Sequence, residues 1–348
     1  MNELGQTATG DISPSVAMLQ MVRGFWVSRA IYVAANLGLA DLLKDEPKRS
    51  EDLAQATATH APSLYRLMCA LASAGIFAQD EQGRFALTPV GATLQTDVPG
   101  SLRAWVLLQL GEEYYRAGGD VMHTLRTGEI AFDHLFGMGV WEYRAQHPEA
   151  AKIFDEAMAN LVGMYNAAVL ASYPFSTIDR VVDVGGGDGS LMVALLQVNP
   201  RMKGMLFDLP HVAGKATRRI GNAGLAGRCE ILAGDAFASV PGGGDAYILS
   251  RMINGFDDAR AVALLKNCHQ AMTEKGKLLV VQRVLPDRVQ HSIAVQALVL
   301  SDFNMMVMIG GRERTEGECR ALLEEAGFRV TKVIPTQSEM TIIECARP

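Results

Sequence analysis

From residue 178 onward, short apolar runs of β type alternate with amphipathic helical stretches. This alternation predicts a doubly wound α/β sheet with mostly parallel strands. The last two runs are close enough in sequence to pair as a hairpin, so we expect an antiparallel edge strand. The predicted strands are DRVVDVG (179–185), GMLFDL (204–209), CEILAG (229–234), DAYILS (245–250), GKLLVVQRVL (276–285), RVTKVIP (329–335) and MTIIECA (340–346).

The residues before about 172 have a helical rhythm instead. The stretch 15–43 is apolar nearly all round and includes Phe25 and Trp26. A helix of this kind needs burial on more than one side. A partner subunit and a larger core within the chain are the two ways to provide it, and we favour the partner subunit.

A compact unit follows, with a helix over 61–77 capped by Ser63 and a short hairpin that turns at Asp80 to Gly83. Helices followed by a small wing predict a winged helix, a fold that often binds DNA. The helix carries one basic residue, Arg66, whereas DNA binding needs several. We interpret the unit as a dimerisation module and keep a DNA-binding regulator as a weaker hypothesis. The predicted domains are 1–100 (helical, winged-helix-like), 101–172 (helical linker and acceptor-pocket region) and 173–348 (α/β).

Composition excludes several function classes. The formal net charge of the 348 residues is −6, which gives no reason to expect nucleic acid or an anionic membrane as a partner. The five cysteines are scattered singly and the seven histidines show no HxxxH pairing, so we expect neither disulfides nor a metal site. The start of the chain has no basic region typical of a secretory signal, and no apolar run is long enough to span a membrane. We therefore expect a cytoplasmic protein.

The stretch VVDVGGGDGS (181–190) is the most informative motif. A strand ending at Asp183 leads into a glycine loop, and a helix is expected to begin at Ser190. Glycines let the backbone turn tightly and let a ligand approach the main chain. The spacing differs from the dinucleotide fingerprint Gly-x-Gly-x-x-Gly, which makes a pyrophosphate ligand less favoured.

Acidic residues at the next strand ends refine this prediction. Asp208 ends the second strand, where a carboxylate commonly holds a ribose diol. Asp235 follows the third strand, where it can accept a hydrogen bond from an adenine amino group. Each aspartate alone is more often a turn former or a helix cap. Together with Asp183, they predict an adenosine that carries a cationic, phosphate-free tail.

The motifs VVDVGGGDG, LFDLPHV, GDAFASVP and GGRERTEGECRALLEEAGF resemble the S-adenosylmethionine-dependent O-methyltransferases of the caffeic-acid type. The resemblance extends over nearly the whole chain and is strongest to bacterial members that methylate polyketides, anthracyclines and phenazines. It implies a homodimer formed through the N-terminal domain, a Rossmann-like class I methyltransferase domain, S-adenosylhomocysteine as product and no metal. The cofactor-binding residues that it implies are Asp183, Gly185, Gly187, Asp208, Leu209, Asp235, Ala236, Phe237, Ser250 and Arg251.

The chain departs from this family where the catalytic base is expected. The family reads His-Asp-Trp at the end of the fourth strand, and its histidine deprotonates the acceptor; Asn254, Gly255 and Phe256 stand here. Of the two glutamates that orient the histidine, one is replaced by Gln282 and the other is retained as Glu313. We take Asn254, Glu313 and Gln282 as the catalytic candidates. An asparagine cannot take up a proton at neutral pH.

Other acidic residues and histidines are further candidates for the base. Asp257 and Asp258 precede a predicted helix and are expected to cap it. His269 and His291 are expected to face solvent. Asp302 is nearer to the expected pocket, but nothing in the sequence orients it.

The stretch LVLSDFNMMVMIGG (298–311) resembles the family's acceptor wall. Methionine side chains adapt to irregular flat ligands, although a single methionine is more often plain core. Their cluster beside a polar residue favours a pocket for an aromatic or polycyclic ligand. The substrate-binding candidates are Trp141, Met158, Asn304, Met305 and Met308.

The sequence thus predicts a methyltransferase whose small aromatic acceptor reacts at oxygen or nitrogen with little or no deprotonation. One alternative is an enzyme of the same fold that binds S-adenosylmethionine without methylating, such as a hydroxylase, decarboxylase or pericyclase. A pseudo-enzyme that binds the cofactor only for stability is a third, weaker hypothesis.

Overall fold

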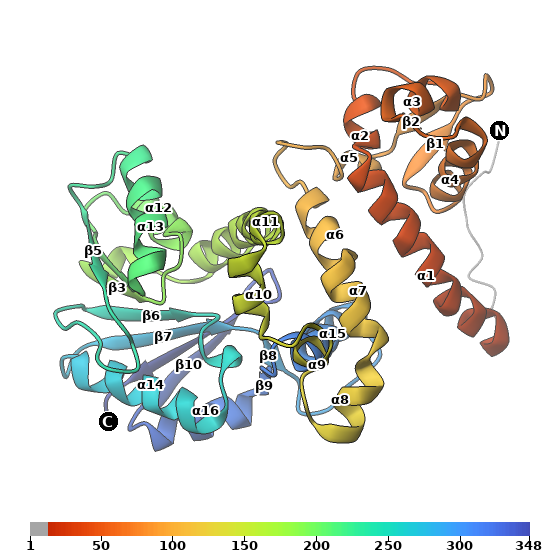
Figure 1. The fold of residues 1–348 in the computed structure, drawn as a ribbon. Coiled ribbons are helices and arrows are strands. Elements are labelled where there is room, and N and C mark those ends of the chain that lie inside the picture. The colour runs from red at the N-terminus through yellow and green to blue at the C-terminus, as the bar shows by residue number, and fades with distance from the viewer. Residues whose placement is uncertain (1–12) are drawn as a thin grey trace, which may run out of the picture. The chain divides into compact units, whose positions relative to one another are not determined.

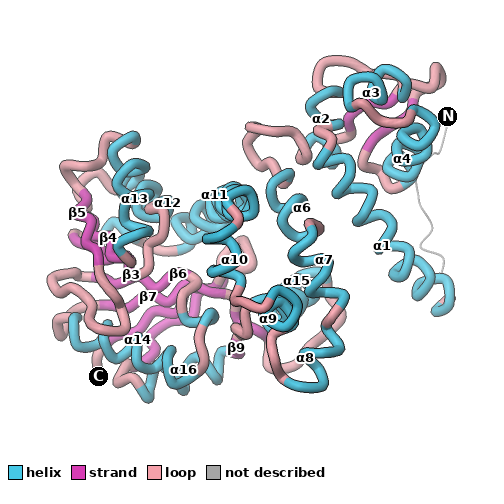
Figure 2. The backbone as a smooth tube through the Cα atoms, in the orientation of Figure 1, coloured by secondary structure: helices cyan, strands magenta, loops and turns pink. Residues whose placement is uncertain are grey.

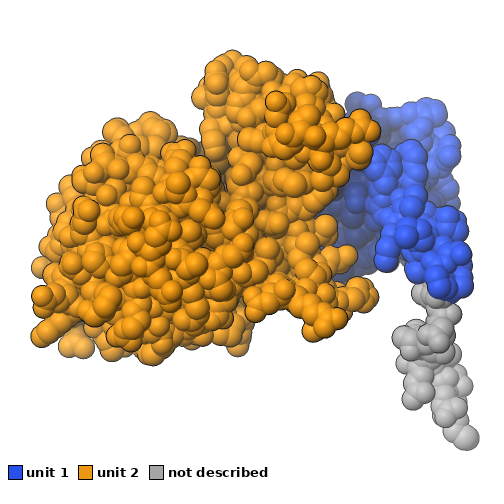
Figure 3. Space-filling view, turned by 90° about the horizontal axis from the view of Figure 1, so that it is seen from below, with its two compact units in different colours: residues 1–115 blue, residues 116–348 orange. Residues whose placement is uncertain are grey.

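The computed structural model describes residues 13–348 and divides into two compact units, Met1–Tyr115 and Arg116–Pro348 (Figure 3). The Ser13 side chain accepts a hydrogen bond from the Val16 N–H and begins the first helix. Every helix and strand below is labelled as in Figure 1.

Unit 1 is mostly helical and has its own apolar core. Leu39, Leu53, Met68, Phe77 and Phe85 are all fully buried in this core. The elements are α1 (Pro14–Asn36), α2 (Leu39–Leu42), α3 (Ser50–Thr57), α4 (Ala61–Ser73), β1 (Phe77–Gln79), β2 (Phe85–Leu87), α5 (Pro89–Ala92), α6 (Arg103–Gln109) and α7 (Glu112–Gly119), which continues past the end of the unit.

The predicted hairpin is confirmed, since β1 and β2 pair antiparallel around a turn in which the Gly83 N–H donates to the Asp80 carbonyl. The prediction that Ser63 caps the helix before this hairpin is wrong. The helix α4 begins at Ala61, two residues earlier, because Pro62 suits the first turn of a helix. Ser63 Oγ instead lies 2.9 Å from Nδ1 of His60.

The helix α1 carries apolar side chains that unit 1 leaves uncovered. Its buried residues are small alanines, whereas Trp26 is 71% exposed and Met21 is 69% exposed. The other exposed apolar side chains of α1 are Val16, Met18, Leu19, Val22, Phe25, Val27 and Val33.

Unit 2 is built on a seven-stranded sheet in the order β10-β11-β7-β6-β3-β4-β5 (Figure 2). Five neighbouring strands are parallel, and β11 pairs antiparallel with both β7 and β10. The reversed strand therefore lies inside the edge formed by β10. The strands are β3 (Arg180–Val184), β4 (Lys203–Asp208), β5 (Cys229–Ala233), β6 (Ala246–Ser250), β7 (Lys277–Gln282), β10 (Arg329–Pro335) and β11 (Thr341–Ala346), and a separate parallel pair is formed by β8 (Val284–Leu285) and β9 (Arg314–Thr315).

Helices cover both faces of this sheet (Figure 1). Successive strand residues point to opposite faces, so Val182 joins the core beneath α14 and α16, and Val181 joins the core beneath α11, α12 and α13. Both cores are fully buried. The helices of unit 2 after α7 are α8 (Val121–Thr127), α9 (Ala131–Phe136), α10 (Val140–Gln146), α11 (Pro148–Ser172), α12 (Ser190–Val198), α13 (Pro210–Asn222), α14 (Asp258–Ala271), α15 (Ile293–Met308) and α16 (Glu316–Glu325), with 3-10 turns η1 (Phe175–Thr177) and η2 (Ile253–Gly255).

We predict that Gly91→Ala destabilises unit 1 by more than about 2 kcal/mol. A Cβ at Gly91 would lie 2.0 Å from the Ile76 carbonyl oxygen, which belongs to the backbone and cannot rotate away. Urea denaturation followed by circular dichroism measures the change. The control is Gly163→Ala in α11, where a Cβ meets nothing within 4 Å and should stabilise the helix by roughly 0.5–1 kcal/mol. Equal effects of the two substitutions would contradict the steric argument.

Candidate functional site

The glycine loop between β3 and α12 lines one side of a large cavity. Gly185 and Gly187 have φ of 71° and 59°, in the left-handed region that favours glycine. A Cβ at Gly186 would lie 2.8 Å from the Asp183 carboxylate, so a side chain there would crowd that group. The helix α12 begins at Ser190, as predicted.

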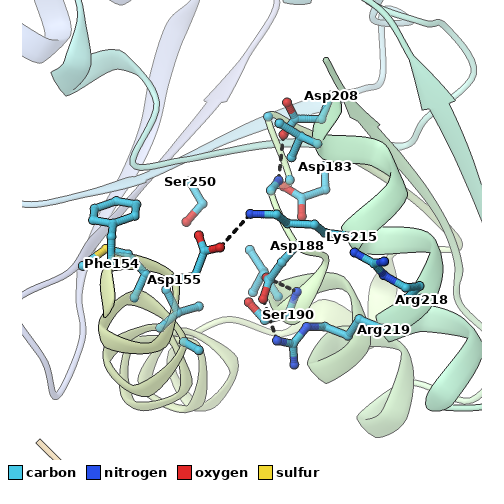
Figure 4. Close-up of a pocket in the computed structure, with 18 of the residues that line it drawn as sticks. Phe154, Asp155, Asp183, Asp188, Ser190, Asp208, Lys215, Arg218, Arg219 and Ser250 are labelled. Atoms are coloured by element: carbon cyan, nitrogen blue, oxygen red, sulfur yellow. Dashed lines mark hydrogen bonds and ion pairs between the residues drawn. The ribbon is translucent and has the colours of Figure 1, made fainter. Parts of the chain in front are cut away.

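This cavity has a volume of about 1460 Å³ and lies at the carboxyl ends of β3, β4 and β6 (Figure 4). The predicted residues Asp183, Gly185, Gly187, Asp208, Leu209, Ser250 and Arg251 line it together. The helices α10 and α11 provide an apolar side with Trp141, Phe154 and Met158, and α13 provides basic residues. A single space therefore brings a polar loop and an aromatic wall together.

Two carboxylates in this cavity have different surroundings. Both oxygens of Asp208 are engaged, because Oδ2 accepts from the Gly187 N–H at 2.8 Å and Oδ1 accepts from the Leu209 N–H at 2.7 Å. Asp183 is 1% exposed, and neither of its oxygens has a hydrogen-bond partner among the described residues. Burial, followed by the negative charge of Asp208, raises the pKa of Asp183 to about 7. An unpaired buried carboxyl group of this kind suits a cationic ligand.

The residues predicted to flank adenine are placed differently. Asp235, Ala236 and Phe237 are not among the residues that line the cavity. Asp235 Oδ1 accepts from the Phe237 N–H, and Asn267 donates to the carbonyls of Ala236 and Phe237. The roles of Asp235 and Ala236 toward adenine, and of Phe237 toward the cofactor, remain predictions.

Ion pairs cross the mouth of the cavity. Lys215 Nζ of α13 lies 2.7 Å from Asp155 Oδ2 of α11, and Arg219 of α13 lies 2.6 Å from Asp188 of the glycine loop (Figure 4). All four side chains are substantially exposed, so each pair contributes little to stability.

Asn254, in the turn η2, contacts Glu313, which directly precedes β9, and both side chains are buried. The Asn254 Nδ2 amide lies 3.4 and 3.3 Å from the two carboxylate oxygens of Glu313, and 3.8 Å from the Met305 sulfur. Asn254 is 8% exposed and Glu313 is 3% exposed. Burial raises the pKa of Glu313, although the charge of Arg283 and the Asn254 hydrogen bond act in the opposite direction.

Gln282 lies apart from this pair. Its Nε2 lies 2.8 Å from Cys319 Sγ, and its Oε1 is buried without a partner among the described residues. The following residue, Arg283, reaches Glu313 instead, with 3.6 Å between Nη1 and Oε1. Within residues 13–348, the Gln282 side chain makes no hydrogen bond to Asn254 or Glu313, and Arg283 is the neighbour of Glu313 at this strand end.

The sequence alone did not indicate Arg283 and its partners as part of the site. Its guanidinium pairs with Glu339 at 2.7 Å and donates to the Tyr165 hydroxyl at 2.9 Å. The signal in the sequence was a basic residue close behind the buried apolar run 278–281 of β7, which is an unusual place for a charge.

Arg314 was missed as well. It is 1% exposed and donates to the carbonyls of Ile253 and Phe256 at 2.8 Å, which fixes the turn that presents Asn254. It also pairs with Asp258 at 2.8 Å. Asp257 caps α14 as predicted, because its side chain accepts from the Arg260 N–H.

The predicted acceptor wall is only partly assembled around Asn254. Met305 contacts Asn254, whereas Met308, the last residue of α15, is buried and only 3% exposed. Trp141 and Met158 line the large cavity. Asn304 is half-buried on α15 and has no side-chain hydrogen bond within residues 13–348.

One group of metal-type side chains occurs within the described chain, outside the cavity. Asp120, His123 and His134 come together at α8 and α9, a juxtaposition that sequence spacing did not reveal. The two imidazoles stack with ring planes 6° apart, and their nitrogens bond to Glu129 and Asp120.

Comparison with known proteins identifies the family. Residues 115–329 match the O-methyltransferase domain and residues 19–97 match the O-methyltransferase dimerisation domain. The phenazine O-methyltransferase PhzM of Lysobacter antibioticus is 42% identical over 339 residues, which cover 97% of this chain and 98% of that protein. The chain belongs to the O-methyltransferase family.

Solved structures agree with this assignment. The mitomycin 7-O-methyltransferase MmcR superposes with a TM-score of 0.88 at 34% identity, covering 96% of this chain and 98% of that one. The O-methyltransferase NcsB1 of neocarzinostatin biosynthesis, solved with S-adenosylmethionine and 2-hydroxy-5-methyl naphthoic acid, superposes with a TM-score of 0.77 at 31% identity, covering 92% of this chain and 96% of that one. A further relative is the phenazine-1-carboxylate N-methyltransferase of Pseudomonas aeruginosa, which is 34% identical over 95% of this chain and 96% of that protein.

This methyltransferase uses S-adenosylmethionine, and its cavity fits that cofactor. The unpaired carboxyl group of Asp183 suits the cationic methionine part, and the side-chain-free glycine loop lets it approach the backbone. No helix in the described part of the chain is both long and apolar enough to cross a membrane.

We predict that the affinity of this methyltransferase for S-adenosylmethionine rises between pH 6 and pH 8. The raised pKa of Asp183, about 7, means that the folded protein holds this proton until the pH passes about 7, so cation binding at pH 6 must displace it. The gain is at most roughly tenfold per pH unit below the pKa. Without ligand the same shift lowers the stability of the fold as the pH rises through 7.

Isothermal titration calorimetry at both pH values, in buffers of different ionisation enthalpy, measures the affinity and the released proton. Asp183→Asn should weaken binding and flatten the pH dependence. A wild-type affinity that is equal at pH 6 and pH 8 would contradict the role of Asp183.

Proposed function

We propose that this enzyme methylates an oxygen or nitrogen of an aromatic specialised metabolite that needs little or no deprotonation. The observation that carries the proposal is the Asn254–Glu313 contact. By the family resemblance, an amide stands where the family has its histidine, and the carboxylate of Glu313 contacts Asn254 and Arg283. An amide takes up no proton at neutral pH, so Asn254 cannot serve as the base.

Magnitudes support methyl transfer without this base. A general base typically contributes about 10²–10⁴ in rate. Alignment of the two reactants can supply roughly 7–11 kcal/mol of the barrier. Acidic phenols, carboxylates and heterocyclic nitrogens therefore remain reactive acceptors, and unactivated hydroxyls do not.

The chain's own residues bind and orient in this proposal. Bound S-adenosylmethionine supplies a methyl group from its sulfonium. After transfer, the sulfur is a neutral thioether and the product is S-adenosylhomocysteine. Asp183, Asp208, Phe237 and the glycine loop hold the cofactor, with Asp235 and Ala236 assigned to its adenine. Asn254 hydrogen-bonds the acceptor, and Glu313 fixes the orientation of that amide.

The relatives support this acceptor class. The Lysobacter relative is a phenazine O-methyltransferase, and the Pseudomonas relative is an N-methyltransferase of phenazine-1-carboxylate. Both atoms that we propose as acceptors therefore occur among similar proteins. The aromatic side of the cavity, with Trp141 and Phe154, suits a flat ring system.

A non-methylating enzyme of the same fold is the second candidate. It is favoured by the position of Gln282, whose amide bonds to Cys319 and makes no contact with the Asn254 pair. The cofactor would then act as a fixed positive charge.

The test uses S-adenosylmethionine labelled in its methyl group, with the purified enzyme and a panel of phenols, carboxylates and heterocyclic nitrogen compounds. We expect label in a product with an equal amount of S-adenosylhomocysteine, measured by mass spectrometry. A changed substrate without label, with the cofactor intact, would establish the second candidate instead. Asn254→Ala should lower kcat, whereas Asn254→His should extend activity to less acidic phenols at pH 8.

We also propose that the enzyme is a homodimer in which a second subunit covers the apolar face of α1. The match to a dimerisation domain and the exposed side chains of α1 support this. The double variant Met21→Glu/Trp26→Glu should shift the protein from dimer to monomer in light scattering after size exclusion. The control Met122→Glu changes a side chain that is 51% exposed in unit 2 and should leave the dimer intact. A dimer that survives the double variant would place the interface elsewhere.

A further inference from the structure

Arg251 has an unusual backbone conformation at the edge of the cavity. It directly follows β6, and its N–H still donates to the Val281 carbonyl at 2.8 Å. Its φ is 54°, in the left-handed region that non-glycine residues seldom adopt. Strain of this kind persists where the surrounding structure enforces it, and it concentrates at ligand sites.

The guanidinium of Arg251 lacks a partner among the residues that the structure describes. Its side chain is partly buried and lines the cavity, yet its guanidinium makes no hydrogen bond or ion pair within residues 13–348. Burial lowers the pKa of Arg251, and the positive charge of Arg283 lowers it further. A guanidinium beside a like charge, with limited access to water, requires a compensating anion.

Three of the nearby acids are already engaged. Arg283 pairs with both Glu313 and Glu339. Asp188 of the glycine loop pairs with Arg219. Asp183 is unpaired within residues 13–348, but it forms no ion pair with Arg251. Among the described residues, Arg283 therefore has two carboxylate partners and Arg251 has none.

We propose that Arg251 binds a carboxylate on the aromatic acceptor and so selects aromatic acids as substrates. This inference rests on the proposed function and adds the substrate class. A guanidinium matches a carboxylate with two parallel hydrogen bonds. Trp141, Phe154 and Met158 line the same cavity and suit the ring that would carry this group.

The cofactor's own carboxylate has the same chemistry and is the competing source, because the family resemblance implies that Arg251 contacts the cofactor. The backbone geometry favours the acceptor. The Arg251 N–H donates to the Val281 carbonyl, two residues before Arg283. Arg283 in turn contacts the Glu313 carboxylate that lies against Asn254.

Binding measured without turnover tests the proposal. The enzyme is saturated with S-adenosylhomocysteine and titrated by calorimetry with 3-hydroxy-2-naphthoate and with its neutral analogue 3-hydroxy-2-naphthamide. We expect the carboxylate to bind about 10- to 100-fold more tightly, as charged hydrogen bonds typically allow. Arg251→Gln should bring this ratio close to one, Arg251→Lys should retain part of it, and the affinity for S-adenosylhomocysteine should change less than about threefold.

The matched control is Arg218→Gln, which removes an exposed arginine from the rim of the same cavity and should keep the ratio. A variant that loses affinity for S-adenosylhomocysteine but keeps the ratio would assign Arg251 to the cofactor and overturn the proposal. A ratio near one in the wild type would overturn it directly, whether or not the variants fold. Carboxylate selectivity without label transfer would refute methylation and leave this binding site standing.

Discussion

The parallel direction of β3, β4, β6 and β7 is the constraint on which the site depends. Parallel strands end at one edge of the sheet, so residues far apart in sequence meet there. The glycine loop, Arg251 and Arg283 each follow a strand at this edge, and Asp208 is the last residue of another strand there. Helices cover both faces of the sheet (Figure 1), so a ligand can reach the sheet only at the ends of its strands.

Electrostatics at this edge differ from those of a site built on a histidine base. Glu313 remains buried, but its charge is balanced by Arg283 and its oxygens contact an amide. Asn254 cannot take up a proton from an acceptor at neutral pH. This is the basis of the proposal that the reactive atom of the acceptor is already ionised or carries a free lone pair.

Local patterns in the sequence predicted most of the fold, because strand and helix periodicity and the glycine loop depend on neighbouring residues. The hairpin of β1 and β2 and the start of α12 are examples. Contacts between distant segments could not be read in this way. Arg314 reaches back to the turn at Ile253, and the Asn254–Glu313 contact joins residues in different segments. The orientation of Gln282 toward Cys319 depends on the packing of α16, which no short motif encodes.

The environment of Gln282 limits which side chain this position tolerates. A glutamate here would be buried beside a thiol, while the neighbouring Arg283 is already paired with Glu313 and Glu339. Such a charge would have no counter-ion among the described contacts of this position, and its burial would lower the stability of the fold. Packing against α16 therefore explains the amide at position 282 independently of any contact with Asn254.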